Sequence, residues 1–164
     1  MEQTIGFIGV GNMGGALARA AARAVDPGRI VVSNRTWEKA EALSKALSCR
    51  VATATEVAES CDLVFLGVKP QMMAETLAPL QETLLFRKDP FVLVSMAAGL
   101  TMEKISALAG GSFPVIRIMP NTPCSVGAGL INSAATIDPR FCSDLGRCIA
   151  LNAPENCGAL PLPH

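Results

Sequence analysis

Three glycines near the N-terminus have the spacing of a loop that binds a phosphate-bearing ligand. Gly9, Gly11 and Gly14 follow an apolar run at residues 4–8 and lead into an alanine-rich segment at residues 13–24. In a strand–loop–helix unit, the first glycine permits a tight turn and the second lets the backbone approach a pyrophosphate. The third lets the helix pack closely on the strand, and the anion lies at the positive end of the helix. The pattern predicts a dinucleotide-binding turn; the alternative is a glycine-rich turn that only packs a helix on a strand.

The residue types at the end of the expected second strand, at residues 29–34, indicate which dinucleotide the site would bind. An acidic residue about 20 positions after the glycines would hold the ribose 2′-hydroxyl of NAD. This chain has Ser33, Asn34, Arg35 and Thr36 there instead. The Arg35 guanidinium can pair with a 2′-phosphate through two parallel hydrogen bonds. We therefore expect NADP(H) as the cofactor, with NAD(H) as the alternative; otherwise Arg35 is a solvated residue at the entry to a helix.

Three further segments follow expected strands and carry candidate site residues. They are residues 68–70, 96–99 and 119–123. Because the carboxyl ends of parallel strands meet at one edge of a sheet, ligands bind in the crevice there. Small residues at Ala97, Ala98 and Gly99 would let a nicotinamide ring lie close to the backbone. Lys69 is either a point charge for an anionic group or simply solvated, and Asn121 either orients a carboxamide or substrate or forms an Asx-turn.

Alternating strand-type and helix-type segments position these residues. Strands are expected at residues 4–8, 29–34, 50–52, 62–68, 91–96 and 115–119, and helices at 13–24, 36–47, 55–60, 71–85 and 101–109. Such alternation implies right-handed crossovers and a parallel sheet with helices on both faces. We predict an α/β fold, a doubly wound Rossmann-type sheet with strand order 3-2-1-4-5-6. The expected core is Ile5, Phe7, Ile8, Ile30, Val32, Leu63, Val64, Phe65, Leu66, Val92, Leu93, Val94, Val115 and Ile118.

The composition narrows the classes of protein. Half of the 164 residues are hydrophobic and 17% are charged, which excludes disorder over most of the chain. Fourteen basic residues balance fourteen acidic ones, so neither nucleic acid nor an anionic membrane is expected as a partner. No signal peptide or membrane span is recognisable, and we expect a cytoplasmic protein. The six cysteines show no metal-ligand spacing, so we expect free thiols and no metal site.

Proton donors are scarce in this sequence. The one histidine is His164, and there is no tyrosine. A dehydrogenase that reduces a carbonyl group usually needs a placed His, Tyr or Lys, and Lys69 is the one evident candidate. A substrate that is already a cationic imine needs less help, because hydride addition neutralises it. No residue is therefore assigned a catalytic role.

Four segments resemble pyrroline-5-carboxylate reductases in order and spacing. They are Phe7-Ile8-Gly9-Val10-Gly11-Asn12-Met13-Gly14, Val64-Phe65-Leu66-Gly67-Val68-Lys69-Pro70, Ser95-Met96-Ala97-Ala98-Gly99 and Arg117-Ile118-Met119-Pro120-Asn121-Thr122-Pro123. The resemblance implies NAD(P)H-dependent reduction of a cyclic imino acid, pyrroline-5-carboxylate, to proline. It also implies that the cofactor is lined by Ile8, Gly9, Val10, Gly11, Asn12, Met13, Asn34, Arg35, Thr36, Val68, Lys69, Pro70, Ala97 and Ala98. One departure is Ala54, where many relatives carry an asparagine near the adenosine.

The resemblance covers about residues 1–135, which we expect to form an NADP-binding domain. Residues 136–164 are expected to be an atypical tail of frameshifted or truncated origin, with a divergent terminal helix as the alternative. The family is oligomeric and continues into a helical domain that forms the dimer and supplies most imino-acid contacts. We therefore expect the chain to bind NADPH with little turnover. The alternatives are a non-catalytic NADP-binding module and a relative of β-hydroxyacid dehydrogenases.

Overall fold

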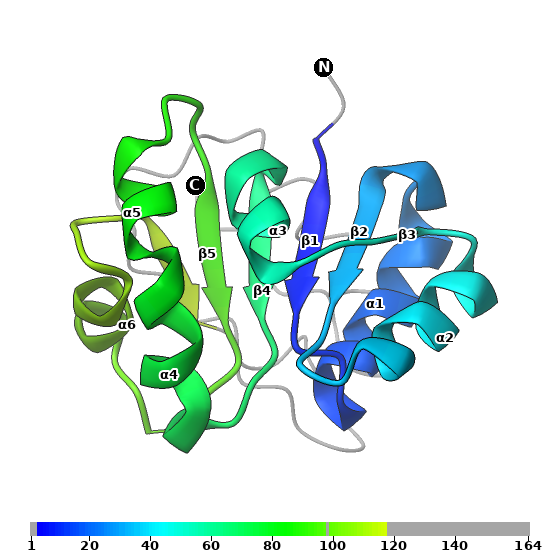
Figure 1. Ribbon diagram of the computed structural model, residues 1–164, viewed down its shortest axis with the longest axis horizontal. Helices are drawn as coiled ribbons and strands as arrows, with labels where there is room; N and C mark the ends of the chain where they lie inside the picture. The colour runs from blue at the N-terminus through cyan, green and yellow to red at the C-terminus, as the bar shows by residue number, and fades with distance from the viewer. Residues whose placement is uncertain (1–2, 98, 118–164) are drawn as a thin grey trace, which may run out of the picture.

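A parallel sheet forms the centre of the molecule. The computed structural model describes residues 3–97 and 99–117. Over these residues, six parallel strands lie in the order β3-β2-β1-β4-β5-β6 (Figure 1), which confirms the predicted strand order. The strands are β1 (Ile5–Ile8), β2 (Ile30–Ser33), β3 (Arg50–Val51), β4 (Leu63–Leu66), β5 (Val92–Ser95) and β6 (Val115–Arg117). The chain leaves β1 toward β2 and later returns to its other side at β4, so a crevice is expected between β1 and β4.

Helices cover both faces of the sheet, as expected for a doubly wound fold. They are α1 (Asn12–Ala24), α2 (Trp37–Leu47), α3 (Ala54–Ser60), α4 (Met73–Leu77), α5 (Gln81–Phe86) and α6 (Met102–Ala109). The apolar sides of α1 and α2 pack on one face, and those of α3 to α6 pack on the other (Figure 1). Successive strand residues point to opposite faces, so Phe7 packs in the first cluster and Ile8 in the second.

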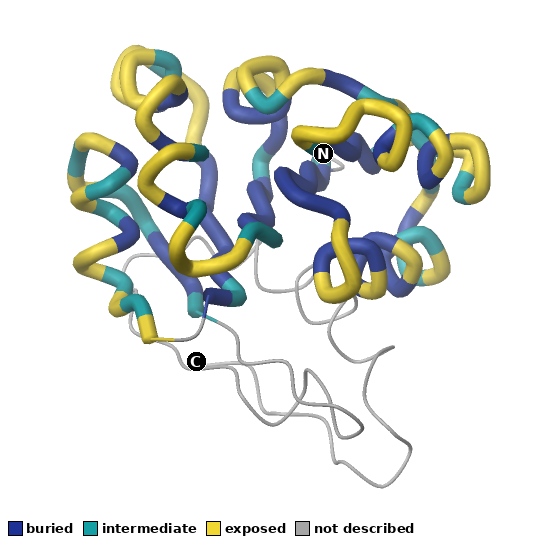
Figure 2. Tube along the Cα trace, turned by 60° about the horizontal axis from the view of Figure 1, so that its bottom comes forward, coloured by how far each residue is buried: buried dark blue, intermediate teal, exposed yellow. Residues whose placement is uncertain are grey.

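The predicted core is buried wherever the structure describes it. Val64 and Leu66 of the predicted core are 1% and 0% exposed in a parallel strand. The Phe7 and Phe65 rings stack with their centroids 4.7 Å apart. The four central strands β2, β1, β4 and β5 are dark blue along their length in Figure 2, while the helices turn yellow on their outer sides. Ile118, also predicted in the core, lies outside the described residues.

The expectation of one long helix over residues 71–85 is wrong. Short 3-10 helices at Pro70–Met72 and Ala78–Leu80 flank α4, and α5 follows the second of them. Pro79 lies inside the second 3-10 helix, and a proline removes a backbone donor and interrupts an α-helix. The apolar spacing survives this interruption, because Met73, Leu77, Leu80 and Leu84 are all buried against the sheet.

The two cysteines in the described part of the chain are free thiols in different environments. Cys61 is buried beside Gly6 of β1, whereas Cys49 is half-buried at the end of α2. Burial raises the pKa of the Cys61 thiol to about 11, against a weaker lowering by its contact with Ser60. Burial raises the pKa of Cys49 as well. Cys61 is therefore a neutral core residue and not a nucleophile.

This difference predicts selective alkylation. In the native protein at pH 8, a maleimide should label Cys49 at least about tenfold faster than Cys61, because Cys61 is both inaccessible and protonated. Peptide mass mapping measures the two rates separately. In denaturant the two rates should become similar, and equal rates in the native protein would show that Cys61 is not packed as described.

Candidate functional site

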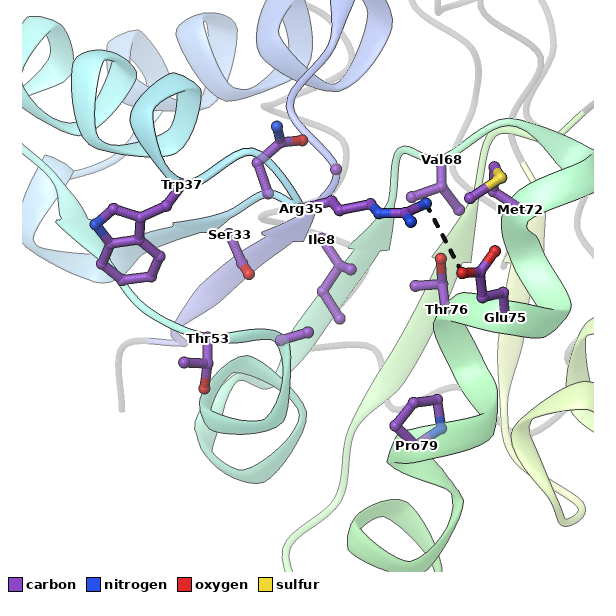
Figure 3. Close-up of a pocket in the computed structure, with 13 residues that line it drawn as sticks. Ile8, Ser33, Arg35, Trp37, Thr53, Val68, Met72, Glu75, Thr76 and Pro79 are labelled. Atoms are coloured by element: carbon purple, nitrogen blue, oxygen red, sulfur yellow. Dashed lines mark ion pairs between the residues drawn. The ribbon is translucent and has the colours of Figure 1, made fainter.

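A cleft of about 350 Å³ opens where β1, β2 and β4 end (Figure 3). It is lined by Ile8, Gly9, Ser33, Asn34, Arg35, Trp37, Thr53, Ala54, Val68, Met72, Glu75, Thr76 and Pro79. The lining comes from both sides of the point where the strand order reverses, since β2 and β4 are the two neighbours of β1. Ligands of open α/β sheets bind at this position.

The glycine turn after β1 is packed tightly against the end of β4. Gly9 has a φ of +92°, which an L side chain rarely adopts. A Cβ on Gly14 would collide with the Gly9 carbonyl oxygen, and so would a Cβ on Gly67. The Gly67 N–H donates to the Ile8 carbonyl at 2.7 Å. Gly9, Gly14 and Gly67 are thus required by the packing of the protein itself, and Gly67 was not recognised from the sequence.

Gly11 differs from these glycines, because a Cβ built on it would meet no atom of the described part of the chain within 4 Å. It is the N-cap of α1, which has no acidic residue in its first turn and no side-chain cap. A second hollow of about 460 Å³ adjoins this helix end, lined by Val10, Gly11, Asn12, Arg19, Lys39, Ala42, Leu43 and Ala46. The positive end of α1 therefore faces open space beside two basic side chains, a setting that suits an anion. No contact within residues 3–97 and 99–117 requires glycine at Gly11, whereas the approach of a pyrophosphate would.

Asn34 ties the glycine turn to the end of β2. Its Oδ1 accepts a hydrogen bond from the Val10 N–H at 3.1 Å, and its Nδ2 donates to the Thr36 carbonyl at 3.1 Å. The Gly9 N–H donates to the Ser33 carbonyl at 2.9 Å. Asn34 was predicted as a cofactor-lining residue; it lines the cleft and also fixes the shape of the turn that would hold the phosphates.

An ion pair spans the opening of the cleft. Arg35 extends from the β2–α2 connection toward α4, where its Nη1 lies 3.7 Å from Oε1 of Glu75 (Figure 3). The two side chains are 79% and 65% exposed. The sequence correctly places no carboxylate at residues 33–36, but the fold brings one there from α4. The residues next to Glu75 in the sequence do not predict that it lies beside Arg35.

A flat apolar side chain forms the far wall of the cleft. Trp37, the first residue of α2, is 44% exposed and lies on the opposite side of Arg35 from Glu75 (Figure 3). Thr53 and Ala54 complete this wall at the start of α3. The Thr53 side chain accepts from the Glu56 N–H, and the Glu56 carboxylate accepts from the Thr53 N–H, so a capping box fixes this corner. Trp37 and Thr53 were not singled out by sequence reasoning, and nothing in their local pattern points to a ligand.

The structure brings together about half of the predicted site residues. Ile8, Gly9, Asn34, Arg35 and Val68 line the cleft, and Val10, Gly11 and Asn12 line the second hollow. Met13, Gly14, Thr36, Lys69, Pro70 and Ala97 line neither of these two hollows. Ala98 and Asn121 lie outside the described residues.

Three of the residues outside the hollows have clear local roles. Thr36 is the N-cap of α2, but its side chain makes no capping hydrogen bond. Lys69 is exposed immediately after β4, where it precedes the Pro70–Met72 turn. Ala97 is buried, and its N–H donates to Ser95 Oγ at 3.2 Å.

The described residues contain neither a candidate metal cluster nor a membrane-spanning helix. No group of three or more His, Cys, Asp or Glu side chains in residues 3–97 and 99–117 is arranged to hold a metal ion. Within the same ranges, no helix has the length and apolar character needed to cross a bilayer.

Comparisons with known proteins agree with this geometry. Residues 4–99 match a family model described as NADP oxidoreductase coenzyme F420-dependent. A pyrroline-5-carboxylate reductase of Escherichia coli (strain K12) is 38% identical over 150 residues, covering 88% of this chain and 55% of that protein. The chain thus spans about half the length of the curated relatives it matches.

Solved structures give the same result. A pyrroline-5-carboxylate reductase from Coxiella burnetii superposes with a TM-score of 0.75 and 28% identity, over 90% of this chain and 56% of that one. The Plasmodium falciparum pyrroline carboxylate reductase, solved with NADP bound, shares the fold with a TM-score of 0.70 and 23% identity, over 90% and 55% of the two chains.

The matched family region contains every residue that lines the cleft, from Ile8 to Pro79. The resemblance to pyrroline-5-carboxylate reductases, first seen in four short segments, extends over most of the chain. The chain therefore belongs to the NADP oxidoreductase, coenzyme F420-dependent, family, and within it resembles the pyrroline-5-carboxylate reductases.

Proposed function

We propose that the cleft binds NADP(H) and that the protein reduces a cyclic imino acid, pyrroline-5-carboxylate, to proline. The observation that carries the proposal is the open space at Gly11, at the uncapped positive end of α1, with Arg35 at the neighbouring strand end. The substrate follows from the similarity to proteins named pyrroline-5-carboxylate reductase.

The cleft and the second hollow at the start of α1 together offer a suitable partner for each part of the cofactor. Backbone N–H groups at the start of α1 would hold the pyrophosphate against Gly11. The Arg35 guanidinium would pair with the ribose 2′-phosphate, and the Trp37 ring offers a surface on which adenine can stack. Val68, at the end of β4, would lie toward the nicotinamide side of the crevice.

The chain's own groups bind and orient, and the bound NADPH would supply the hydride. A protonated cyclic imine is neutralised when its carbon accepts a hydride, so no side chain has to donate a proton in that step. Lys69, exposed just beyond β4, is a candidate partner for the carboxylate of the imino acid. The expectation that this chain turns over little by itself stays a prediction, and NADPH oxidation in the presence of pyrroline-5-carboxylate measures it.

Trp37 makes cofactor binding directly visible. It is the only tryptophan in the sequence and lines the cleft, so its fluorescence reports on this site alone. Reduced nicotinamide absorbs in the region where tryptophan emits, so NADPH bound nearby should quench Trp37 in a saturable way. Bovine serum albumin at the same tryptophan concentration controls for simple absorption of light by NADPH. Quenching no stronger than in that control would count against the proposal.

Replacing Arg35 with alanine should reduce the preference for NADPH over NADH. We expect NADPH to bind more tightly than NADH, and the Arg35→Ala change to shrink the difference in binding free energy by about 1–3 kcal/mol. Calorimetric titration with each nucleotide measures the difference, and higher salt should weaken NADPH binding more steeply. Arg23→Ala, at the other end of α1, is the matched control. Equal affinities of the unmodified chain for the two nucleotides would refute the assignment of Arg35.

A further inference from the structure

Glu75 faces Arg35 across the cleft, although residues 33–36 at the end of β2 contain no carboxylate. We infer that Glu75 determines cofactor specificity: its carboxylate competes with the ribose 2′-phosphate for Arg35 and so limits the preference for NADPH over NADH. This inference rests on the proposed function. It concerns a residue of α4 that lies far from the glycine turn in sequence and reaches the same cleft through the fold.

The ion pair between Arg35 and Glu75 can separate easily. The 3.7 Å between Nη1 of Arg35 and Oε1 of Glu75 is within ion-pair range but longer than a hydrogen bond. Both side chains are largely exposed, so the pair contributes little to the stability of the fold. A ligand can therefore separate the two residues without disturbing the elements that carry them.

The backbone holds Glu75 at the opening. Met73 and Leu77 on the same short helix are completely buried against the sheet, and this anchors α4. Met72, Glu75 and Thr76 line the cleft (Figure 3). The position of the carboxylate next to Arg35 is thus set by core packing on the other side of α4.

The charges in the cleft give Glu75 its effect. Among the described residues that line the cleft, Arg35 and Glu75 are the only ones with charged side chains. A 2′-phosphate must displace the Glu75 carboxylate in order to pair with Arg35, and it brings negative charge toward a carboxylate as it does so. NADH has a 2′-hydroxyl instead, which can donate a hydrogen bond to a carboxylate. The Glu75 carboxylate therefore disfavours NADPH and accommodates NADH.

The test is the Glu75→Gln variant, which keeps the size of the side chain and removes its charge. The ratio of NADPH affinity to NADH affinity should rise about three- to tenfold at low salt, and the rise should shrink at high salt. Glu82→Gln, an exposed glutamate of α5 outside the cleft, should leave the ratio unchanged within about twofold. In an Arg35→Ala background, Glu75→Gln should change the ratio by less than half of its original effect, because the residue for which the two anions compete is gone.

The outcomes separate this inference from the proposed function. Binding of neither nucleotide by the unmodified chain would overturn both. Binding of NADPH with an unchanged ratio in Glu75→Gln would overturn the inference alone. A full-sized effect in the Arg35→Ala background would also overturn it, since competition for Arg35 would then not be the cause.

Discussion

Gly14→Ala is expected to destabilise the fold by about 3 kcal/mol, because the new Cβ would collide with the carbonyl oxygen of Gly9. The obstacle is backbone at a turn that is held on two sides. The Gly9 N–H is bonded to Ser33, and Gly67 packs against the same carbonyl. The collision can therefore be relieved only if α1 moves away from β1. In an unconstrained helix the same change would instead stabilise by about 1 kcal/mol, so the sign of the effect is informative.

Urea denaturation followed by circular dichroism measures the free energy of unfolding. The matched control is Gly28→Ala, where the new Cβ would meet Asp26 at an ordinary contact distance of 3.4 Å. Gly28 lies in an exposed turn before β2, away from the cleft. An unchanged or increased stability of Gly14→Ala would show that the strand and the helix are not packed as closely as described.

Gly11→Ala is expected to do the opposite: it should leave the fold intact and abolish tight cofactor binding. Its Cβ meets none of the described residues within 4 Å, so the free energy of unfolding should fall by no more than about 1 kcal/mol, the cost of alanine at an N-cap. The same methyl group would occupy the space that a pyrophosphate needs. We expect the Kd for NADPH to rise about 10- to 100-fold, equivalent to about 1.4–2.8 kcal/mol.

Fluorescence titration of Trp37 gives the affinity, and the urea experiment gives the stability of the same sample. Gly28→Ala again serves as the control, with both quantities expected to match the unmodified chain. If Gly11→Ala bound NADPH as well as the unmodified chain does, the pyrophosphate would not lie at the start of α1.

The strands and their order could be predicted because the signals are local and strong. Residues 63–66 form a continuous apolar run, as a strand buried on both faces requires, and the glycine spacing at Gly9 fixes where β1 ends. The prediction of one long helix at residues 71–85 also rested on a local signal, but it was wrong. The apolar period of this segment is real and its apolar residues are buried, but Pro79 breaks the hydrogen bonding that the period alone implies.

The parts of the site that could not be predicted from the sequence are those that depend on tertiary structure. Gly67 looks like one more residue of an apolar run, and its contact with the Gly9 carbonyl exists only once β1 and β4 pair. Trp37 begins a helix, and helical periodicity does not indicate that it borders a cleft. Glu75 is separated from Arg35 by two strands, two α-helices and a 3-10 helix, so their approach depends on the complete fold.

The central claim is that the turn at Gly11 and the Arg35 strand end together hold NADP(H). Calorimetric titration of the 164-residue chain with NADPH, alongside the Gly11→Ala variant, tests it most directly. Our account predicts saturable binding at one site per chain and a loss of at least about tenfold in affinity in the variant. No saturable binding to the folded chain, or equal binding by the two proteins, would contradict it.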